Sequence, residues 1–204
     1  MQTNGFEEIK EMTAVVISQR VLPRSRATSI LLVIGAAAVT ALAAQWEIHL
    51  PFTPVPITGQ TFAVLLTGAA LGMTLGAAGQ LVYVAAGAFG LPVYAGGAAG
   101  WDAARAAGTT GYLVGFIVAA AVVGYMAERR QDRTFPNMFT AFIFGSFIIY
   151  FFGVIGLMLI FDMTVSEAIV AGVIPFLIGD LIKAAAAGLL LPGTWRLVGE
   201  YPRP

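Results

Sequence analysis

Apolar residues run in six long segments along the chain, and the stretches between them hold most of the polar residues. The segments cover residues 29–46, 58–74, 76–91, 111–126, 138–161 and 175–191. A helix that crosses the ~30 Å hydrocarbon layer of a membrane needs roughly 17 to 25 such residues. The pattern therefore predicts an all-α fold, a polytopic membrane protein built as a bundle of six transmembrane helices.

Turn-forming residues predict how the segments are joined. The turn between the second and third segments is so short that we expect these two helices to form a hairpin. Pro175 and Pro192 bracket the sixth segment. Proline suits the first turn of a helix and stops a helix just past its end. We therefore expect the sixth helix to stop before Pro192.

Basic residues predict the orientation in the membrane. Nine of the eleven Lys and Arg residues precede the first segment, lie between the fourth and fifth, or follow the sixth: Lys10, Arg20, Arg24, Arg26, Arg129, Arg130, Arg133, Arg196 and Arg203. The positive-inside rule makes that side cytoplasmic, so we expect both termini in the cytoplasm of a plasma-membrane protein. On the opposite side, the loops 46–57, 92–110 and 162–167 contain a single basic residue, Arg105.

We expect three parts in the chain: a cytoplasmic tail over 1–28, a transmembrane domain over 29–196 and a short cytoplasmic tail over 197–204. Asn4 and Glu7 match the pattern of a helix N-cap and its box partner. The first tail is therefore either a short helix on the inner membrane surface or a partly ordered segment.

The first apolar segment has a second interpretation. Arg24 and Arg26 precede an apolar run that ends in Ala41-Leu42-Ala43, as in a cleaved signal peptide. The transmembrane interpretation is favoured because the run is long enough to span the membrane. Removing it would leave five helices and move the amino terminus outside.

Composition supports a membrane protein and excludes several functions. Apolar residues make up 58% of the chain and charged residues 11%, against ~25% charged in soluble domains. The net charge is zero, without a basic stripe, so we expect no nucleic-acid partner. Without cysteine, and with His49 as the only histidine, we expect no metal site, no cofactor and no thiol nucleophile.

Catalytic motifs are missing from the sequence as well. The sequence has neither a Gly-x-Ser-x-Gly elbow nor a phosphate-binding loop for ATP. We therefore expect no catalytic residues, and any transport driven by ATP would need another subunit to hydrolyse it.

Asp180 and Lys183 are two charged residues inside the sixth apolar segment. A charge in a membrane span costs ~2.5 to 3.5 kcal/mol even on the lenient insertion scale, so something must offset it. Three residues apart on a helix, the two side chains share a face. They form either a structural ion pair or part of a polar ligand site. Because Asp180 lies five residues from the outer end of the segment, such a site would open outward.

Two outer loops and several small residues allow a structural or a functional interpretation. Residues 50–60 contain three prolines, and residues 90–97 are apolar with flexible glycines. These loops are either lids over a site or packing on the helix ends. Small residues four apart, such as Ala37 and Ala41 or Gly68, Gly72 and Gly76, allow close helix contact within the bundle or with another subunit.

Three motifs resemble the signature segments of the BioY family, the biotin-specific S components of energy-coupling factor (ECF) transporters. They are Pro54-Val-Pro-Ile-Thr-Gly-Gln-Thr61, Gly90-Leu-Pro-Val-Tyr-Ala-Gly-Gly97 and Gly179-Asp-Leu-Ile-Lys183. The resemblance covers about residues 27–196. It departs from the family at Gly108-Thr-Thr-Gly-Tyr112, where such proteins show Gly-Pro-Thr-Gly-Gly, and over 101–107, which includes Arg105.

The resemblance implies a subunit that captures biotin from outside and delivers it inward. It would dock on a transmembrane coupling subunit that is carried by two ATPase subunits, through the Ala37 and Ala41 face of the first helix. Two alternatives remain: a solitary biotin carrier, and an integral membrane enzyme that uses Asp180 and Lys183 for proton transfer.

The chemistry of biotin agrees with this set of residues. Asp180 can accept a hydrogen bond from a ureido N–H, Lys183 can donate to the ureido carbonyl, and Arg105 can pair with the carboxylate. The other expected site residues are Tyr83, Gln60, Gly96 and Gly97. The candidates for the apolar walls are Tyr83, Tyr94, Trp101 and Phe89.

Overall fold

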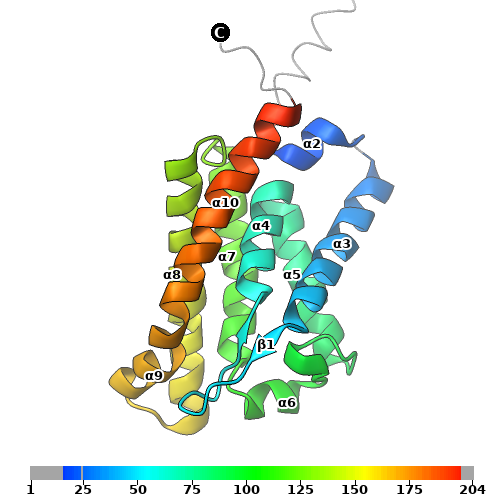
Figure 1. Cartoon of the computed structure of the whole chain (residues 1–204). Helices are drawn as coiled ribbons and strands as arrows, with labels where there is room; N and C mark the ends of the chain where they lie inside the picture. The colour runs from blue at the N-terminus through cyan, green and yellow to red at the C-terminus, as the bar shows by residue number, and fades with distance from the viewer. Residues whose placement is uncertain (1–15, 24, 199–204) are drawn as a thin grey trace, which may run out of the picture.

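The chain folds into a helical bundle with one small β ribbon (Figure 1). The computed structural model describes residues 16–23 and 25–198, so the predicted cap at Asn4 and Glu7 lies outside the described residues. The longest helices are α3 (Arg26–Ala44), α4 (Gln60–Leu71), α5 (Met73–Ala88), α7 (Thr110–Glu128), α8 (Phe135–Phe161) and α10 (Leu177–Val198). Each of the six predicted segments overlaps one of them over most of its length.

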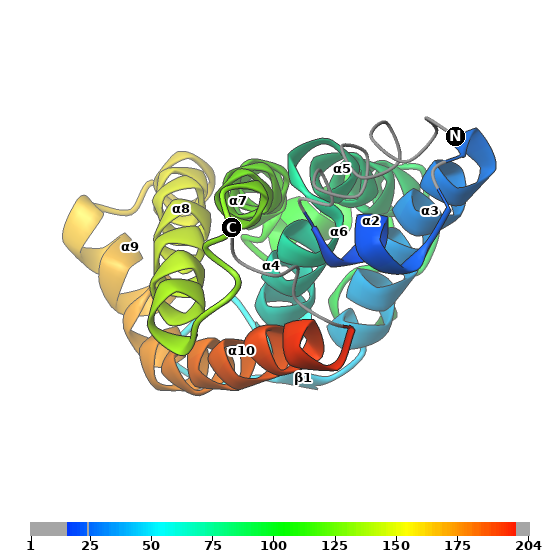
Figure 2. The same ribbon diagram turned by 90° about the horizontal axis from the view of Figure 1, so that it is seen from above.

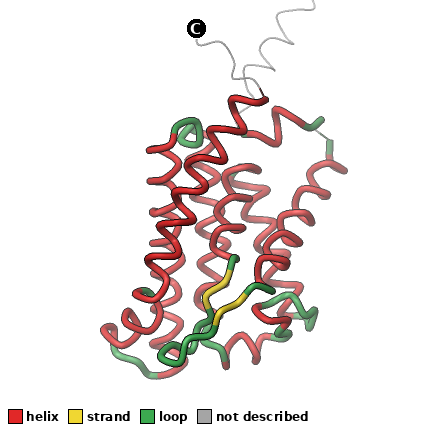
Figure 3. Tube along the Cα trace, in the orientation of Figure 1, coloured by secondary structure: helices red, strands yellow, loops and turns green. Residues whose placement is uncertain are grey.

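Shorter elements connect these helices. They are α2 (Ile17–Val21), α6 (Trp101–Ala106), α9 (Val165–Gly172), the 3-10 turns η1 (Ala95–Gly97) and η2 (Ile174–Phe176), and the strands β1 (Glu47–Ile48) and β2 (Ile57–Thr58). The strands pair antiparallel, with Glu47 opposite Thr58 and Ile48 opposite Ile57. Figure 3 shows this ribbon among the loops at one end of the bundle.

Viewed along the bundle, α8, α7, α5 and α3 form a row, with α10 and α4 in front of it (Figure 2). One end of the bundle carries α2, the α7–α8 loop and the last turn of α10, and we call it the basic end. The opposite end carries the β ribbon, α6 and α9, and we call it the loop end (Figure 1). Both ends of the described chain therefore lie at the basic end, as the alternation of the predicted segments requires.

Four stretches are long and apolar enough to cross a membrane: Arg26–Ala44, Thr110–Glu128, Phe135–Phe161 and Val165–Val198. The last of these includes α9, η2 and α10. With 12 and 16 residues, α4 and α5 fall below the roughly 17 residues that a full crossing needs. The structure thus supports a multi-pass membrane protein, and six crossings remain a prediction.

Close backbone contacts explain the frequent glycines. Gly72, at φ 86°, makes the turn of the predicted hairpin between α4 and α5, a conformation that favours glycine. A Cβ on Gly68 would lie 2.7 Å from the carbonyl oxygen of Ala120 on α7. A Cβ on Gly76 would lie 2.8 Å from the Cα of Gly68. These glycines serve packing inside the bundle.

The prediction that the sixth helix stops before Pro192 was wrong. Helix α10 continues through Pro192 to Val198. Proline removes one backbone hydrogen bond in a helix, but tertiary contacts hold the turn that follows it. Trp195 is 2% exposed, and its indole N–H donates to Asp132 Oδ2 at 2.6 Å. This contact ties the end of α10 to the α7–α8 loop.

Two predicted outer loops contain helices. Helix α6 lies within the predicted loop 92–110, and α9 begins inside the predicted turn 162–167. The Thr164 side chain accepts from the Glu167 amide, and the Glu167 carboxylate accepts from the Thr164 amide. This capping box is readable in the sequence and would have predicted the start of α9.

Candidate functional site

A cavity at the loop end encloses about 550 Å³ of empty space, including the part that is open to solvent. The lining residues come from the loop before α4, the loop after α5, and helices α4, α7, α8 and α10. They are Val55, Pro56, Thr58, Gln60, Thr61, Tyr94, Ala95, Thr109, Tyr112, Leu113, Phe116, Tyr150, Phe176 and Lys183. Both predicted lid loops therefore contribute to its wall.

Lys183 is the charged residue among those lining residues, and its ammonium makes three short contacts. Nζ donates to Asp180 Oδ1 at 2.9 Å, to Thr61 Oγ1 at 2.6 Å and to the Thr58 carbonyl oxygen at 3.0 Å. An ammonium has three N–H donors, so each has an acceptor. Lys183 thus ties α10 to the strand β2 and to the start of α4.

Asp180 lies behind Lys183 and is 4% exposed. Its Oδ1 also accepts from Thr61 Oγ1 at 3.2 Å, and its Oδ2 accepts from the Tyr150 hydroxyl at 2.6 Å. A buried ion pair is tolerated when further hydrogen bonds satisfy its remaining lone pairs, as they do here. The prediction that the two side chains share a face of the sixth helix is confirmed, and they form an ion pair. A ligand role for the pair stays a prediction.

Gln60 and Tyr83 form a second polar contact at the same wall. Gln60 Nε2 donates to the Tyr83 hydroxyl oxygen at 2.6 Å, while Gln60 Oε1 accepts from Thr58 Oγ1 at 2.8 Å. Gln60 lines the cavity, whereas Tyr83 is 1% exposed and supports Gln60 from behind. The polar wall thus runs from Gln60 through Thr58 to Lys183.

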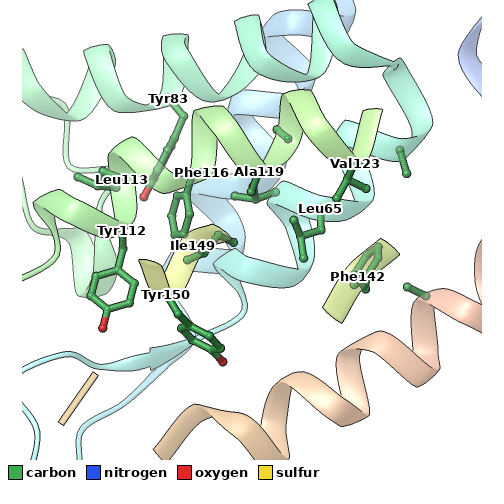
Figure 4. Packing of buried hydrophobic residues seen from close by; sticks show 14 of the residues in the cluster. Leu65, Tyr83, Tyr112, Leu113, Phe116, Ala119, Val123, Phe142, Ile149 and Tyr150 are labelled. Carbon is green, nitrogen blue, oxygen red and sulfur yellow. The ribbon is translucent and has the colours of Figure 1, made fainter. Parts of the chain in front are cut away.

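Aromatic rings form the apolar part of the cavity lining. The Phe176 ring centroid lies 6.5 Å from that of Tyr112 and 6.4 Å from that of Tyr150. Figure 4 shows Tyr112, Phe116 and Tyr150 extending from their helices at one end of the core, with the Tyr150 hydroxyl directed toward α10. The Tyr112 hydroxyl donates to the Gly172 carbonyl oxygen at 2.6 Å. The rings are thus fixed by contacts between helices.

The other predicted site residues lie around the cavity rather than in its wall. Arg105 is exposed on α6, four residues before Thr109, which lines the cavity. Gly96 and Gly97 form the turn η1 with φ of 62° and 79°, next to the lining residue Ala95. A Cβ on Gly96 would collide with the Glu47 carboxylate, so this turn packs on β1.

Among the candidate wall residues, Tyr94 lines the cavity and the other three do not. Tyr83 lies behind Gln60, while Phe89 is 91% exposed and Trp101 is 43% exposed. The expectation that Phe89 and Trp101 form walls was therefore wrong. Both sit at the loop end with their rings outward, where aromatic residues of membrane proteins meet the interface.

The predicted docking residues of the first helix face the bundle. Ala37 is 8% exposed and belongs to the core, and Ala41 is partly buried against that core. The outward face of α3 at this level carries Ala38 and Val39 instead. A docking role for Ala37 and Ala41 stays a prediction.

Several residues of the cavity were not predicted from the sequence, among them Thr61, Tyr112, Tyr150 and Phe176. Thr61 was inside a quoted motif, next to Gln60, but a hydroxyl is a common side chain at a helix start. Tyr112 was noted only as a departure from a family pattern. For Tyr150, the available signal was a hydroxyl in the middle of an apolar run, which the hydrophobic pattern does not separate from its neighbours.

Comparisons with known proteins give one family. The model of the BioY family matches residues 12–200. A biotin transporter BioY of Rhizobium etli is 38% identical over 85% of this chain and 94% of its own length. The biotin transporter BioY of Thermotoga maritima is also 38% identical, over 70% of this chain and 82% of its own length.

A solved structure shares the fold. The crystal structure of the S-component for biotin from an ECF-type ABC transporter aligns with a TM-score of 0.74 and 20% sequence identity. The alignment covers 85% of this chain and 95% of that one.

Proposed function

The chain belongs to the BioY family, and from this premise we propose that it is the biotin-binding subunit of a vitamin transporter. It is a multi-pass protein of the plasma membrane and a transport protein rather than an enzyme. The observation that carries the proposal is the cavity at the loop end, where the Asp180–Lys183 network faces aromatic rings.

Biotin has chemistry that complements both walls. Its ureido head carries two N–H donors and a carbonyl acceptor, while its fused ring and chain are apolar. Lys183 and the hydroxyls of Thr61 and Tyr150 offer the polar partners, and Phe116 and Phe176 offer apolar contact. Burying the ureido head at the polar wall satisfies its donors and acceptor, as burial of polar groups requires.

Asp180 would take part through its neighbours. Its carboxylate is not among the lining atoms, and Thr61 and Tyr150 already donate to it. A ureido N–H can bond to Asp180 after one of these hydroxyls rotates away. The Lys183 ammonium would then exchange one of its three acceptors for the ureido carbonyl.

The biotin carboxylate needs a cationic partner outside the polar wall. We assign it to Arg105, which lies on α6 near the cavity rim and is the basic residue of the loop end besides Lys183 in the described chain. Asp180, Lys183, Arg105 and the carboxylate then sum to zero charge. A site that closes over its ligand is favoured by such neutrality.

Transport follows from this binding step. We propose that six helices cross the membrane with the loop end outside, so that the cavity takes biotin from outside. Delivery inward would use a transmembrane coupling subunit and two ATPase subunits, since the sequence has no phosphate-binding loop of its own. A solitary carrier is the second candidate.

Equilibrium binding of radiolabelled biotin to the purified chain in detergent tests the proposal. We expect saturable binding of one biotin per chain without ATP, and equal binding by Arg196→Gln, an exposed change at the basic end. A monodisperse, folded protein without saturable binding would overturn it. Uptake into liposomes that contain this chain alone would identify a solitary carrier instead.

A further inference from the structure

A second cavity lies at the basic end, between α2 and the beginning of α3. It encloses about 1,110 Å³ of empty space, including the part that is open to solvent. Its described lining residues are Ser18, Gln19, Leu22, Pro23, Ser25, Arg26, Thr28, Ser29, Ile30, Leu32 and Leu75. They include four hydroxyls and one arginine, and none of them is a carboxylate. Such a lining favours an anion.

The N-terminus of α3 provides backbone donors in this cavity. Ser25 caps the helix, and its side chain accepts from the Thr28 amide at 3.0 Å. Among the described residues, the amides of Arg26 and Ala27 have no hydrogen-bond acceptor. Free amides and the helix dipole make the first turn of a 19-residue helix favourable for a negative group.

Ser18 gives an independent indication of a ligand. Its side chain lines the cavity from α2 and is 8% exposed, yet its hydroxyl has no hydrogen-bond partner in the described chain. A buried hydroxyl without a partner destabilises the fold, because it has lost its hydrogen bonds to water. A ligand oxygen in the cavity would remove this cost by accepting from Ser18.

The apolar lining and the position in the membrane identify the kind of anion. Leu22 and Ile30 line the cavity and are 41% and 60% exposed. Arg26 begins a candidate membrane span, so this turn lies at the level of the lipid headgroups. A phosphate on the polar side and acyl chains on the apolar side fit this lining.

We propose that the cavity between α2 and α3 binds a phosphate group, and that its source is an anionic phospholipid. Arg26 and the free amides of α3 would hold the phosphate oxygens, Ser18 would donate a further hydrogen bond, and Leu22 and Ile30 would contact the acyl chains. The elements that line this cavity and those that line the proposed biotin site lie at opposite ends of the bundle (Figure 1). The test of lipid binding is therefore independent of the test of biotin binding.

Native mass spectrometry of the full chain in detergent tests the proposal with three probes. They are phosphatidylglycerol, diacylglycerol with the same chains, and inorganic phosphate. We expect retention of one phosphatidylglycerol per chain, and retention of diacylglycerol lower by about tenfold or more, the effect of losing one charge-assisted hydrogen bond. Excess inorganic phosphate should displace part of the lipid.

The variant Ser18→Ala/Arg26→Gln should lose at least about tenfold in phosphatidylglycerol retention. Arg196→Gln, at the same end but outside the cavity, should retain the lipid as wild type does. Ser18→Ala alone should melt no lower than wild type without lipid, because it removes a buried unpartnered hydroxyl. This measurement separates lipid binding from folding.

Any of three results would overturn the proposal. Equal retention of diacylglycerol and phosphatidylglycerol would show that no phosphate is recognised. Equal retention of phosphatidylglycerol by wild type and Ser18→Ala/Arg26→Gln would show that the lipid binds elsewhere. Tight binding of inorganic phosphate without retention of the lipid would overturn the assignment of the source.

Discussion

At the scale of single residues, Lys183 is the side chain on which the proposed biotin site depends most. Replacing it by Met keeps much of the bulk but removes three hydrogen bonds and leaves the Asp180 charge without its cation. We expect biotin affinity to fall by at least the ~1.5 to 3 kcal/mol of one charge-assisted bond. Radiolabelled biotin binding to the purified variant measures this loss.

The double variant Asp180→Asn/Lys183→Met is the matched control. It removes both charges, so it should recover part of the thermal stability that Lys183→Met loses, because an uncompensated buried charge is the larger cost. Biotin affinity should stay low in both. Wild-type affinity in a folded Lys183→Met protein would mean that the ion pair is structural only.

The next prediction concerns Arg105 as the partner of the biotin carboxylate. Wild type should bind biotin more tightly than biotinamide, whose charge is removed, and Arg105→Gln should erase most of that difference. The comparison of four dissociation constants isolates the interaction. Asp102→Asn, a charge change on the same exposed helix, should preserve the difference. If Arg105→Gln still binds biotin more tightly than biotinamide, the carboxylate is not paired with Arg105, and Lys183 becomes the candidate partner.

Asp132 predicts a pH dependence of stability. Burial raises the pKa of Asp132 from 3.8 to about 6, against the opposing effects of the Trp195 hydrogen bond and the Arg133 charge, whose Nε lies 3.3 Å from Oδ1. The raised pKa favours the protonated side chain in the folded state. Protonation of Asp132 therefore stabilises the folded state fully below about pH 4, and this stabilisation is lost as the pH rises through 6.

The Asp132→Asn variant should remove this dependence. It keeps an oxygen acceptor for Trp195 and never ionises, so it should be more stable than wild type at pH 7.5 by up to roughly 3 kcal/mol. Thermal unfolding in detergent between pH 4 and 8 measures both curves. Asp102→Asn, an exposed carboxylate, should follow wild type. Parallel curves for Asp132→Asn and wild type would contradict the prediction.

At the scale of elements, substitutions in helix α3 distinguish a role in internal packing from a role in docking. Ala37 lies in the core, so Ala37→Trp should overpack α3 against the bundle, lowering the yield of folded protein and biotin binding together. Ala38, next to it and exposed, is the control: Ala38→Trp should leave both unchanged. An Ala37→Trp protein with normal stability and biotin binding, but without association with a coupling subunit, would support docking through Ala37.

The apolar pattern predicted the elements well where length and hydrophobicity decide them. Each of the six segments overlaps one of the six longest helices, and the turn at Gly72 makes the expected hairpin. The pattern failed where tertiary contacts override a local signal. Pro192 stays helical because Trp195 anchors the following turn to Asp132, and those two residues are 63 apart in sequence.

The residues of the site likewise fall into those that a local sequence pattern predicted and those whose position depends on tertiary packing. Asp180 and Lys183 were predictable because charges in an apolar span are rare and three residues apart share a face. Tyr150 and Phe176 were not, since their place beside Asp180 depends on how α8, η2 and α10 pack. The outward direction of the Trp101 and Phe89 rings likewise follows from loop geometry alone.

At the scale of the whole molecule, most described basic residues lie at the end of the bundle opposite to the cavity that we assign to biotin. Six of the eight described basic residues gather at the basic end: Arg20, Arg26, Arg129, Arg130, Arg133 and Arg196. The cavity proposed for biotin is lined by elements of the other end. The positive-inside rule therefore predicts that the cavity lies on the outer side. The proposed capture of biotin from outside requires this orientation.

The orientation can be tested directly because the chain contains no cysteine. Asp102→Cys at the loop end and Arg196→Cys at the basic end each introduce one thiol at an exposed position. A membrane-impermeant maleimide applied to spheroplasts should label Asp102→Cys at once. Arg196→Cys should react only after the membrane is permeabilised, since a cytoplasmic thiol is shielded from the reagent.

Wild type, without a thiol, measures the background, and biotin binding by both variants confirms that each is folded. Labelling of Arg196→Cys in sealed spheroplasts, with Asp102→Cys protected, would reverse the orientation and turn the cavity toward the cytoplasm. The Asp180–Lys183 pair would then receive ligand from inside. Capture from outside would be excluded, because the cavity has its lining loops at the loop end only.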